Sequence, residues 1–371
     1  MKNIIFLILF TCIAAFGQNI AKIDSGNING ARYRILFPAN WKGKLVMYAH
    51  GYEFNGSPLQ SKNPQFLKSM SPFLDRGFAV AASDYQFQGL ALAQGVNDTE
   101  ALRKYFFGKY GKPDSTFMVG HSMGGGITLA MLENFDNNYQ AGLALCPLSS
   151  RIYLQCRKEY DMYATFNGLF PGIITPLSTI FDLKSNYQAQ DSRKMLSRAM
   201  DIKKAIIAKD SVLAVAFAKR FDLKLDDLPF SLFFNENVLR DIAQKAGGNP
   251  FDNTNTVYSG FPDNVLVNQK AERLAATVNP EAVFGKYDRS GNINKPVLLV
   301  HTLYDQLIPP NYGVTNFENM VHHKGKDQYF TVKYTNGQGH CAFSPAQTAQ
   351  AFDELRNWTK TGTKAKPGFI E

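Results

Sequence analysis

Short apolar segments alternate with amphipathic ones from residue 31 to residue 147, and this alternation limits the fold more than any other feature. Some of the apolar segments, such as 45–49 and 142–146, are almost continuously hydrophobic, which is typical of strands covered on both faces. The segments between them have helical spacing. The alternation returns at residue 295 and continues to the last helical segment, PAQTAQAFDELRNW. An α/β protein is therefore predicted, with a mostly parallel sheet and helices on both of its faces.

Residues 151–285 interrupt this alternation. They lack strong strand patterns and are rich in Phe, Leu and Met at helical spacing. We expect a large, mostly helical cap that is inserted between two strands and covers a pocket. The alternative is a separate helical domain with an unrelated function. The predicted organisation is a signal peptide (1–17), the first part of an α/β core (18–150), the cap insertion (151–285) and the second part of the core (286–371).

The first residues have the layout of a secretory signal peptide. One Lys precedes an apolar run from Ile4 to Phe16, and Ala15-Phe16-Gly17 fits a small-x-small cleavage site. The run is too short to span a bilayer comfortably, and no other stretch approaches about 18 uninterrupted apolar residues. Cleaved export to the periplasm or the extracellular space, without stable membrane insertion, is favoured over a lipid anchor through Cys12.

Charge argues against nucleic-acid partners. The chain has 40 Lys and Arg against 31 Asp and Glu, a formal net charge of +9. These basic residues are scattered singly and form no dense stripe. A solvated exported surface is therefore favoured over binding of nucleic acid or acidic polysaccharide.

Three cysteines remain after the expected cleavage: Cys146, Cys156 and Cys341. An oxidising compartment permits one bridge. Closeness in sequence makes Cys146–Cys156 the first expectation, although sequence does not settle the pairing. No Cys/His spacing resembles a zinc site, and the pair His322-His323 is too isolated to suggest one, so no metal is expected.

The run FMVGHSMGGG, residues 117–126, carries the strongest functional signal. An apolar strand leads into Gly120-His121-Ser122-Met123-Gly124, and a helix-forming segment follows at once. Glycine on both sides of Ser122 permits the tight turn of a nucleophile elbow, which lifts the hydroxyl above the sheet edge. A phosphate-binding loop would want a Lys-Ser/Thr pair or a second spaced glycine pattern, and GHSMGGGIT has neither. We therefore predict Ser122 as a nucleophile.

A serine hydroxyl needs a base, and the base needs an orienting acid. In sheets of this kind the acid and then the histidine follow the serine, at the ends of later strands. Asp305 ends the apolar strand in PVLLVHTLYD, and His340 follows the next strand in YTNGQGHCAF. We predict Asp305 as the acid and His340 as the base.

The other histidines and two further aspartates are less suitable because of their positions. His301 lies inside an apolar strand and is expected to be a core residue. His322 and His323 lie at a helix end and are expected to face solvent. The remaining candidates occupy the nucleophile turn, the end of an earlier strand and a position ahead of the last strands: His121, Asp84 and Asp288.

Acyl transfer also requires donors for the developing oxyanion, and losing one such donor costs ~3 kcal/mol of activation free energy. The backbone N–H of Met123, immediately after the nucleophile, is the first expected donor. The second is expected in the loop MYAHGYEFNG, where the N–H of Tyr52 is assigned and that of Glu53 is the alternative.

With these motifs the sequence resembles the α/β-hydrolases. The resemblance covers the chain from about Ala31 to Trp358 and rests on HGY, GHSMGG, DQLIP and GQGHCAF. It implies an eight-stranded, mostly parallel sheet with a Ser-His-Asp triad at its C-terminal edge. The later segments further resemble secreted bacterial hydrolases of the esterase or prolyl-oligopeptidase-like type. Cys341 beside His340 departs from the pattern and could restrict the histidine loop.

The predicted function is a secreted serine hydrolase that cleaves carboxylic esters through an acyl-enzyme, without a cofactor. The aromatic, helical cap suggests apolar or aromatic acyl groups, and a sugar-linked ester if residues 249–255 line the rim. The substrate is thus a small-molecule or saccharide-linked ester. A serine peptidase is the first alternative, because the same triad cleaves amides. A non-catalytic binding protein on this scaffold is the second.

Overall fold

A computed structural model describes residues 20–189 and 191–371. The signal peptide expected at 1–17, with Cys12, lies outside the described residues. No helix in the described ranges combines the length and the apolar character needed to cross a membrane.

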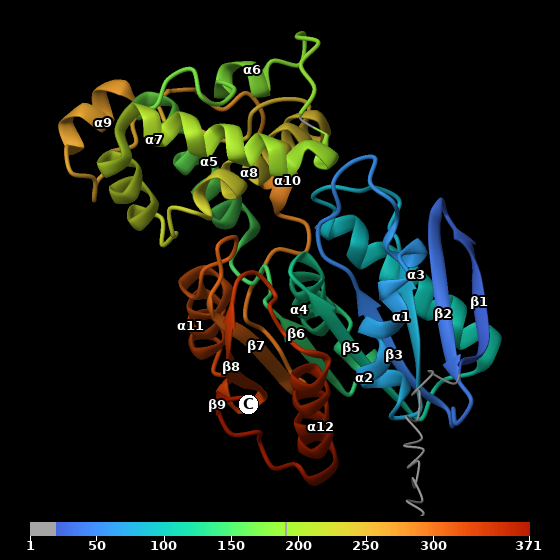
Figure 1. The fold of residues 1–371 in the computed structure, drawn as a ribbon. Helices are drawn as coiled ribbons and strands as arrows, with labels where there is room; N and C mark the ends of the chain where they lie inside the picture. Colours follow the sequence, from blue (N-terminus) through green and yellow to red (C-terminus); the bar gives the residue numbers. More distant parts are fainter. Residues whose placement is uncertain (1–19, 190) are drawn as a thin grey trace, which may run out of the picture.

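A nine-stranded sheet forms the centre of the molecule, in the order β1-β2-β4-β3-β5-β6-β7-β8-β9 (Figure 1). The strands β1 and β2 run antiparallel, as do β2 and β4, and all other neighbours are parallel. The bounds are β1 Ile20–Ile28, β2 Ala31–Pro38, β3 Lys44–Ala49, β4 Phe78–Ser83, β5 Ser115–His121, β6 Ala141–Leu145, β7 Val297–Tyr304, β8 Phe330–Gln338 and β9 Gly368–Phe369.

The predicted mostly parallel sheet is confirmed, but it has one more strand than the eight implied by the resemblance. The additional edge strand β9 is only two residues long. The sequence pattern also does not indicate the strand β1. Its burial pattern shows why, since most of IAKIDSGNI is exposed and only backbone pairing with β2 makes it a strand.

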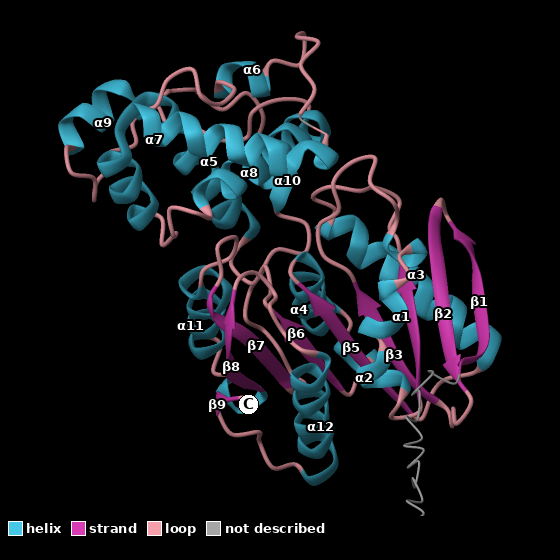
Figure 2. Ribbon diagram, viewed as in Figure 1, coloured by secondary structure: helices cyan, strands magenta, loops and turns pink. Residues whose placement is uncertain are grey.

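Helices cover both faces of the sheet (Figure 2). One apolar core joins the sheet to α1, α2 and α12, and the other joins it to α3, α4 and α11 and continues into the cap. The bounds are α1 Gln65–Ser69, α2 Ser71–Leu74, α3 Leu92–Tyr110, α4 Met123–Asn134, α11 Asn316–His323 and α12 Pro345–Thr361, with a π-helical turn at Asn311–Thr315 before α11.

The start of α3 differs from the expected position. The segment NDTEALRKYFFGKYG, residues 97–111, predicts a helix capped by Asp98 or Thr99, but the helix begins at Leu92 and both residues lie buried inside it. Leu92 and Val96 lie one turn apart and both are buried, so the apolar face of the helix begins earlier than the capping pattern suggests. Asp98 instead accepts a hydrogen bond from the backbone N–H of Gln86 at 2.9 Å.

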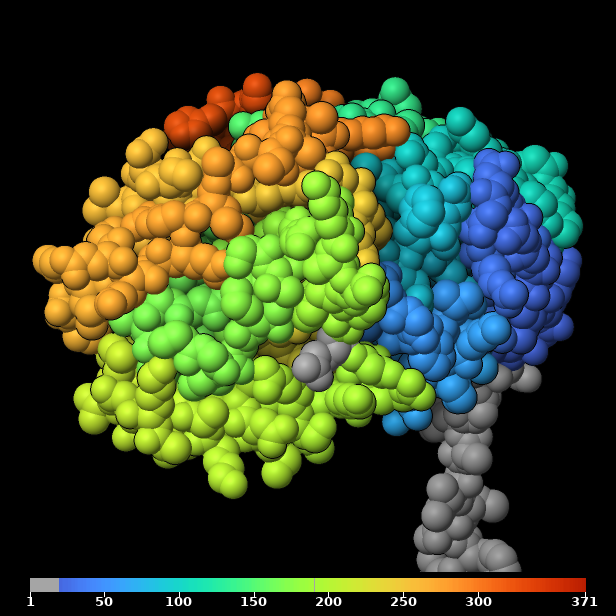
Figure 3. Space-filling view, turned by 90° about the horizontal axis from the view of Figure 1, so that it is seen from above, coloured from blue at the N-terminus to red at the C-terminus, as the bar shows by residue number. Residues whose placement is uncertain are grey.

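The segment between β6 and β7 is helical and lies over the end of the sheet where the parallel strands finish (Figure 1). Seen from that side, residues of this segment form most of the surface, beside the N-terminal part of the core (Figure 3). We refer to residues 151–285 as the cap. Its helices are α5 Ile152–Leu169, α6 Leu177–Phe181, α7 Met195–Arg220, α8 Leu228–Ala246, α9 Asn264–Lys270 and α10 Pro280–Phe284.

A buried carboxylate on α8 ties the cap to two loops of the core. Asp241 accepts hydrogen bonds from the Asn55 side chain at 3.0 Å and from the backbone N–H of Leu90 at 2.7 Å. Lys245, one turn further along α8, pairs with Asp241 at 2.9 Å and donates to the carbonyl of Gln88. These bonds hold the 88–90 loop against the cap.

Candidate active site

Ser122 lies on a strained turn between β5 and α4. Its φ of 57° and ψ of −123° are far from the regions that a residue with a side chain prefers, at a cost of about 1–3 kcal/mol. Its N–H donates to the carbonyl of Leu145, and its carbonyl accepts from the N–H groups of Gly126 and Leu148, all within 3.1 Å. The surrounding backbone therefore holds the hydroxyl at the carboxyl edge of the sheet.

Glycine is required on both sides of this turn because backbone segments pass too close for a Cβ. A Cβ on Gly120 would lie 2.1 Å from the carbonyl oxygen of Gly124, and one on Gly124 would lie 2.0 Å from that of Ala49. The helix α4 can thus start directly against β3 and β5, as the sequence pattern predicts.

The structure brings the three predicted side chains into one hydrogen-bonded chain. Nε2 of His340 lies 2.8 Å from Oγ of Ser122, and Nδ1 of His340 lies 2.8 Å from Oδ2 of Asp305. Asp305 directly follows β7, and His340 follows β8. A neutral imidazole that donates its Nδ1–H to the carboxylate leaves Nε2 free to accept the serine proton.

Asp305 is buried and firmly oriented. Its Oδ1 accepts hydrogen bonds from the backbone N–H groups of Leu307 at 2.9 Å and Ile308 at 2.8 Å, while Oδ2 faces His340. Burial pushes the pKa of Asp305 upward, but the charge and hydrogen bond of His340 and the Ile308 N–H outweigh it and bring the pKa below its usual value. The carboxylate is therefore ionised at neutral pH.

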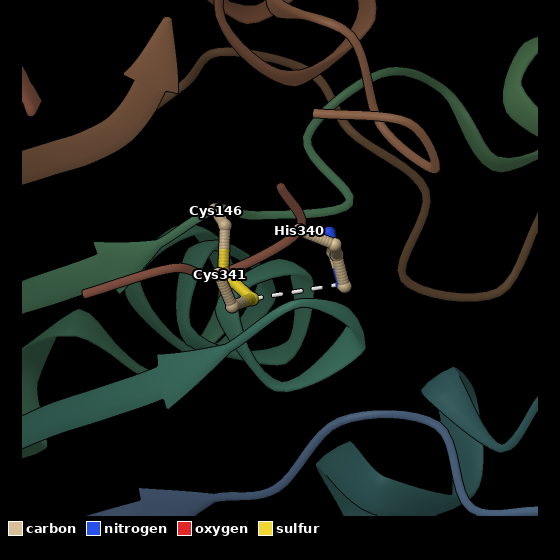
Figure 4. A group of neighbouring side chains, drawn as sticks. All are labelled: Cys146, His340 and Cys341. Carbon is tan, nitrogen blue, oxygen red and sulfur yellow. Dashed lines mark hydrogen bonds between the residues drawn. A yellow bond between two sulfur atoms is a disulfide. The ribbon is translucent and has the colours of Figure 1, made fainter. Parts of the chain in front are cut away.

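A disulfide lies beside the histidine. Cys341 is bonded to Cys146 at the end of β6, and its Sγ lies 3.5 Å from Nε2 of His340 (Figure 4). The expected Cys146–Cys156 bridge was wrong. Cys156 is a buried free thiol inside α5, whereas Cys341 shares with Cys146 the edge where the parallel strands end. Sequence distance could not reveal this, because the bridged residues are 195 positions apart.

Removing this bridge is expected to lower both stability and rate. Replacing Cys146 and Cys341 by serine should reduce the free energy of unfolding by about 2–5 kcal/mol, because a long loop is then no longer closed in the unfolded chain. The turnover number should fall about tenfold or more, since the histidine loop loses an anchor next to His340. Urea unfolding and initial rates measure the two effects. Dithiothreitol should reproduce them in the unaltered protein and have no effect on the double variant; equal responses of both proteins would contradict the prediction.

The group Cys146, His340 and Cys341 is close enough to resemble a metal site, with ligand atoms within 4.8 Å of one another. The two sulfurs are joined, however, and neither can become the thiolate that binds a metal. These residues therefore do not fit a metal ion.

Met123 and Tyr52, whose N–H groups are the expected oxyanion donors, line the same cavity as Ser122. Met123 is the first residue of α4, so its N–H has no carbonyl partner within the helix. Tyr52 lines the cavity that contains Ser122, and a Cβ on Gly51 would lie 3.2 Å from Cβ of Ser122. The alternative, Glu53, holds other loops, since its carbonyl accepts from Gly89 and its carboxylate from the N–H of Gln60.

Two other histidines, the partly buried His121 and the fully buried His301, lie near His340. His121 contacts the hydroxyl of Tyr48 at 3.1 Å, and burial, with His340 nearby, lowers the pKa of His121 to about 4. The ring of His301 faces the Thr302 carbonyl through Nδ1, and its Nε2, which lies 4.0 Å from Asp305, has no hydrogen-bond partner among the described residues. Both are therefore neutral near pH 7.

The other side chains considered as candidates in the sequence have structural roles or lie at the surface. Asp84 accepts from the N–H of Ser61 and fixes a loop. Asp288 accepts from the N–H of Ile152 at the start of α5 and pairs with Arg151. The remaining pair, His322 and His323, ends α11 at the surface.

The cavity at Ser122 is small. Its volume is about 50 Å³. Its lining is mostly apolar and comes from the core loops and from the cap: Tyr52, Leu90, Met123, Leu148, Phe234, Val238, Leu307 and Ile308. A cavity of about 620 Å³ also reaches Leu90, but Ser122 and His340 do not line it. The smaller cavity is therefore the one that contains Ser122 and His340.

The cap contributes three polar or reactive side chains to this cavity that the sequence did not reveal. Gln155, Cys156 and Glu159 line it from α5. No motif marks them, because a helix that packs against a core shows only its apolar spacing in the sequence.

No protein-family model matches the sequence, and no curated protein shows significant similarity to it. Among solved structures, an esterase from Pyrococcus furiosus is similar over 91% of both chains, with 14% identity and a TM-score of 0.48. Est1E from Butyrivibrio proteoclasticus with bound ferulic acid shares 15% identity over 91% of this chain and 99% of its own, with a TM-score of 0.47. The acylaminoacyl peptidase of Pyrococcus horikoshii shares 11% identity over 91% of this chain but only 41% of its own, with a TM-score of 0.44.

The topology itself decides the fold. An antiparallel edge is followed by parallel strands in the order β4-β3-β5-β6-β7-β8, a strained turn carries Ser122 after β5, and an acid and a histidine follow β7 and β8. The chain has the α/β-hydrolase fold.

Proposed function

We propose that this protein is a serine hydrolase that cleaves carboxylic esters through an acyl-enzyme. The observation that carries the proposal is the hydrogen-bonded chain Ser122–His340–Asp305, with two contacts of 2.8 Å. Of these three residues, only Ser122 has a strained backbone conformation, with a positive φ. Such strain persists where the surroundings enforce it, and it is concentrated at functional sites.

Each residue has a role in this reaction. Ser122 attacks the ester carbonyl while His340 accepts its proton at Nε2, and Asp305 stabilises the imidazolium that forms. The N–H groups of Met123 and Tyr52 donate to the oxyanion. His340 then gives the proton to the departing alkoxide, which leaves as the alcohol. A water molecule, deprotonated by the same histidine, releases the acid and restores Ser122.

The size of the cavity supports short acyl groups. An acyl group stays bonded to Ser122 after the alcohol has left, so it must be accommodated in the space of about 50 Å³. Aromatic and sugar-linked acyl groups, which the cap composition suggested, exceed this volume unless cap side chains move. Amide cleavage by a peptidase requires room for an extended chain on both sides of the bond. A small cavity covered by α5 and α8 offers less room of this kind, so an ester is favoured over a peptide.

Export belongs to the same proposal. The disulfide Cys146–Cys341 supports it, because structural disulfides form and persist in oxidising compartments. The leader expected at 1–17 would supply the route.

A substrate panel tests the function. Purified protein is assayed with p-nitrophenyl esters from acetate to decanoate and with peptide p-nitroanilides. We expect the highest kcat/KM for the shortest esters and a decline with acyl length, because longer chains must displace Leu90 or Phe234. Turnover of anilides without turnover of esters would overturn the proposal in favour of a peptidase. Absence of any turnover, with no covalent labelling by a fluorophosphonate probe, would favour a non-catalytic protein.

A further inference from the structure

A polar pair faces the otherwise apolar cavity at Ser122. Gln155 and Glu159 lie one turn apart on α5, line this cavity and are only 3% and 7% exposed. Buried polar side chains normally have hydrogen-bond partners, and a buried polar atom without one requires an explanation. The proposed mechanism uses neither residue.

The hydrogen bonds of this pair leave acceptors unused. Nε2 of Gln155 donates to Oε1 of Glu159 at 3.2 Å, and Nζ of Lys158 lies 2.9 Å from the same oxygen. Oε1 of Gln155 is buried without a hydrogen-bond partner among the described residues. Exchanging the oxygen and nitrogen of the Gln155 amide does not remove this deficit, because the amide oxygen would then face the carboxylate of Glu159.

The second carboxylate oxygen is also available. Both contacts of Glu159 fall on Oε1, and within the described residues Oε2 accepts no hydrogen bond. Lys158 donates as well to the carbonyl of Leu307, so it is held at the side of the pair and balances the carboxylate charge. The polar end of the cavity therefore offers two acceptors that are unused within the described part of the chain, Oε1 of Gln155 and Oε2 of Glu159, beside the one remaining N–H of the Gln155 amide.

We propose that Gln155 and Glu159 form a subsite for a hydrogen-bond donor, an amine or a hydroxyl, carried on the short acyl group of the substrate. The inference rests on the proposed ester hydrolysis. The acyl group is the part that must remain in the cavity, and because Ser122, Gln155 and Glu159 all line this small cavity, the donor is expected close to the carbonyl. An amine can serve both acceptors, whereas a hydroxyl can serve one.

Three esters of nearly equal shape test the subsite. The 4-nitrobenzyl esters of alanine, lactic acid and 2-methylpropanoic acid carry an amine, a hydroxyl and a methyl group at the same carbon. We expect kcat/KM to decrease in that order, with the value for the alanine ester about 10- to 100-fold above that for the 2-methylpropanoate. A factor of this size corresponds to hydrogen bonds gained with buried, partly charged acceptors. Preference for the lactate over the alanine ester, with both above the 2-methylpropanoate, would identify a hydroxyl as the donor.

Variants separate recognition from folding. Gln155→Leu and, independently, Glu159→Gln should each lower the ratio of kcat/KM between the alanine and 2-methylpropanoate esters, Gln155→Leu by about tenfold. The matched control is Gln350→Leu, because Gln350 and Glu354 form the same one-turn contact, also 3.2 Å, on the exposed face of α12. It should leave the ratio unchanged.

Two results would overturn the subsite and a third would overturn its basis. Equal kcat/KM for the three esters, or a ratio that Gln155→Leu does not change, refutes the subsite while ester hydrolysis stands. If no ester is cleaved and no fluorophosphonate labels the protein, the proposed function itself fails. Should Gln155→Leu not fold, the order of the three esters with the unaltered protein still decides, once each kcat/KM is divided by the rate constant for alkaline hydrolysis of the same ester.

Discussion

Replacing Ser122 by alanine is expected to lower kcat for ester hydrolysis by a factor on the order of 10⁶, since loss of the nucleophile leaves only the oxyanion donors and binding. The hydroxyl is the atom that bonds to the acyl carbon, and neither His340 nor Asp305 can take that role from its present position. The measurement is the initial rate with the best short-chain ester of the panel, with pre-purified enzyme at high concentration to detect the residual rate.

Stability provides the control for this variant. Alanine meets the same backbone strain as serine at φ 57°, and the serine hydroxyl forms its hydrogen bond with His340, which is exposed enough to bond to water instead. The melting temperature should therefore change by no more than a few degrees. Fluorophosphonate labelling should disappear completely. An enzyme that retains more than a few per cent of its rate, or that is still labelled, would show that another residue is the nucleophile.

The positions of Ser122, Asp305 and His340 could be predicted because each is tied to a strand that is visible in the sequence. Strands buried on both faces produce continuous apolar runs, and the carboxyl ends of parallel strands meet at one edge. The order of these residues along the chain then places them together. The structure brings them within 2.8 Å of their partners for this reason.

Features that depend on contacts between distant segments could not be predicted in the same way. The strand β1 exists because it pairs with β2, although its own residues are mostly exposed. The bridge partner of Cys146 is Cys341, which only the sheet topology brings near. The pattern near Asp98 looked like a helix start, but the apolar face that begins at Leu92 had the larger effect.

The cap was the least predictable part of the site. Its helical character follows from composition, but which of its side chains reach Ser122 depends on how α5 and α8 pack onto the core. Bonds such as Leu90 N–H to Asp241 set that packing, and they join residues 151 positions apart. The polar end formed by Gln155 and Glu159 is therefore invisible in the sequence, although we expect it to determine which acyl groups fit.

Replacing Asp305 by asparagine is expected to lower kcat about 10⁴-fold through the tautomer of His340. Oδ1 of Asp305 accepts from the N–H groups of Leu307 and Ile308, so the asparagine oxygen must stay in that position. Its NH₂ group then takes the place of Oδ2 and faces Nδ1 of His340, which can no longer carry a proton there. The proton moves to Nε2, and the histidine loses the lone pair that accepts the proton of Ser122.

The rate and the reactivity of Ser122 should therefore fall together in Asp305→Asn, while KM changes only a few-fold because the carboxylate does not touch the substrate. Initial rates with the best short-chain ester, together with the rate constant of fluorophosphonate labelling, measure this. The matched control is Asp288→Asn, where the side chain caps α5 and pairs with Arg151, and where kcat should stay within about twofold. A loss of less than tenfold in Asp305→Asn would mean that the acid does not fix the tautomer, and that His340 is held mainly by the neighbouring loop and its disulfide.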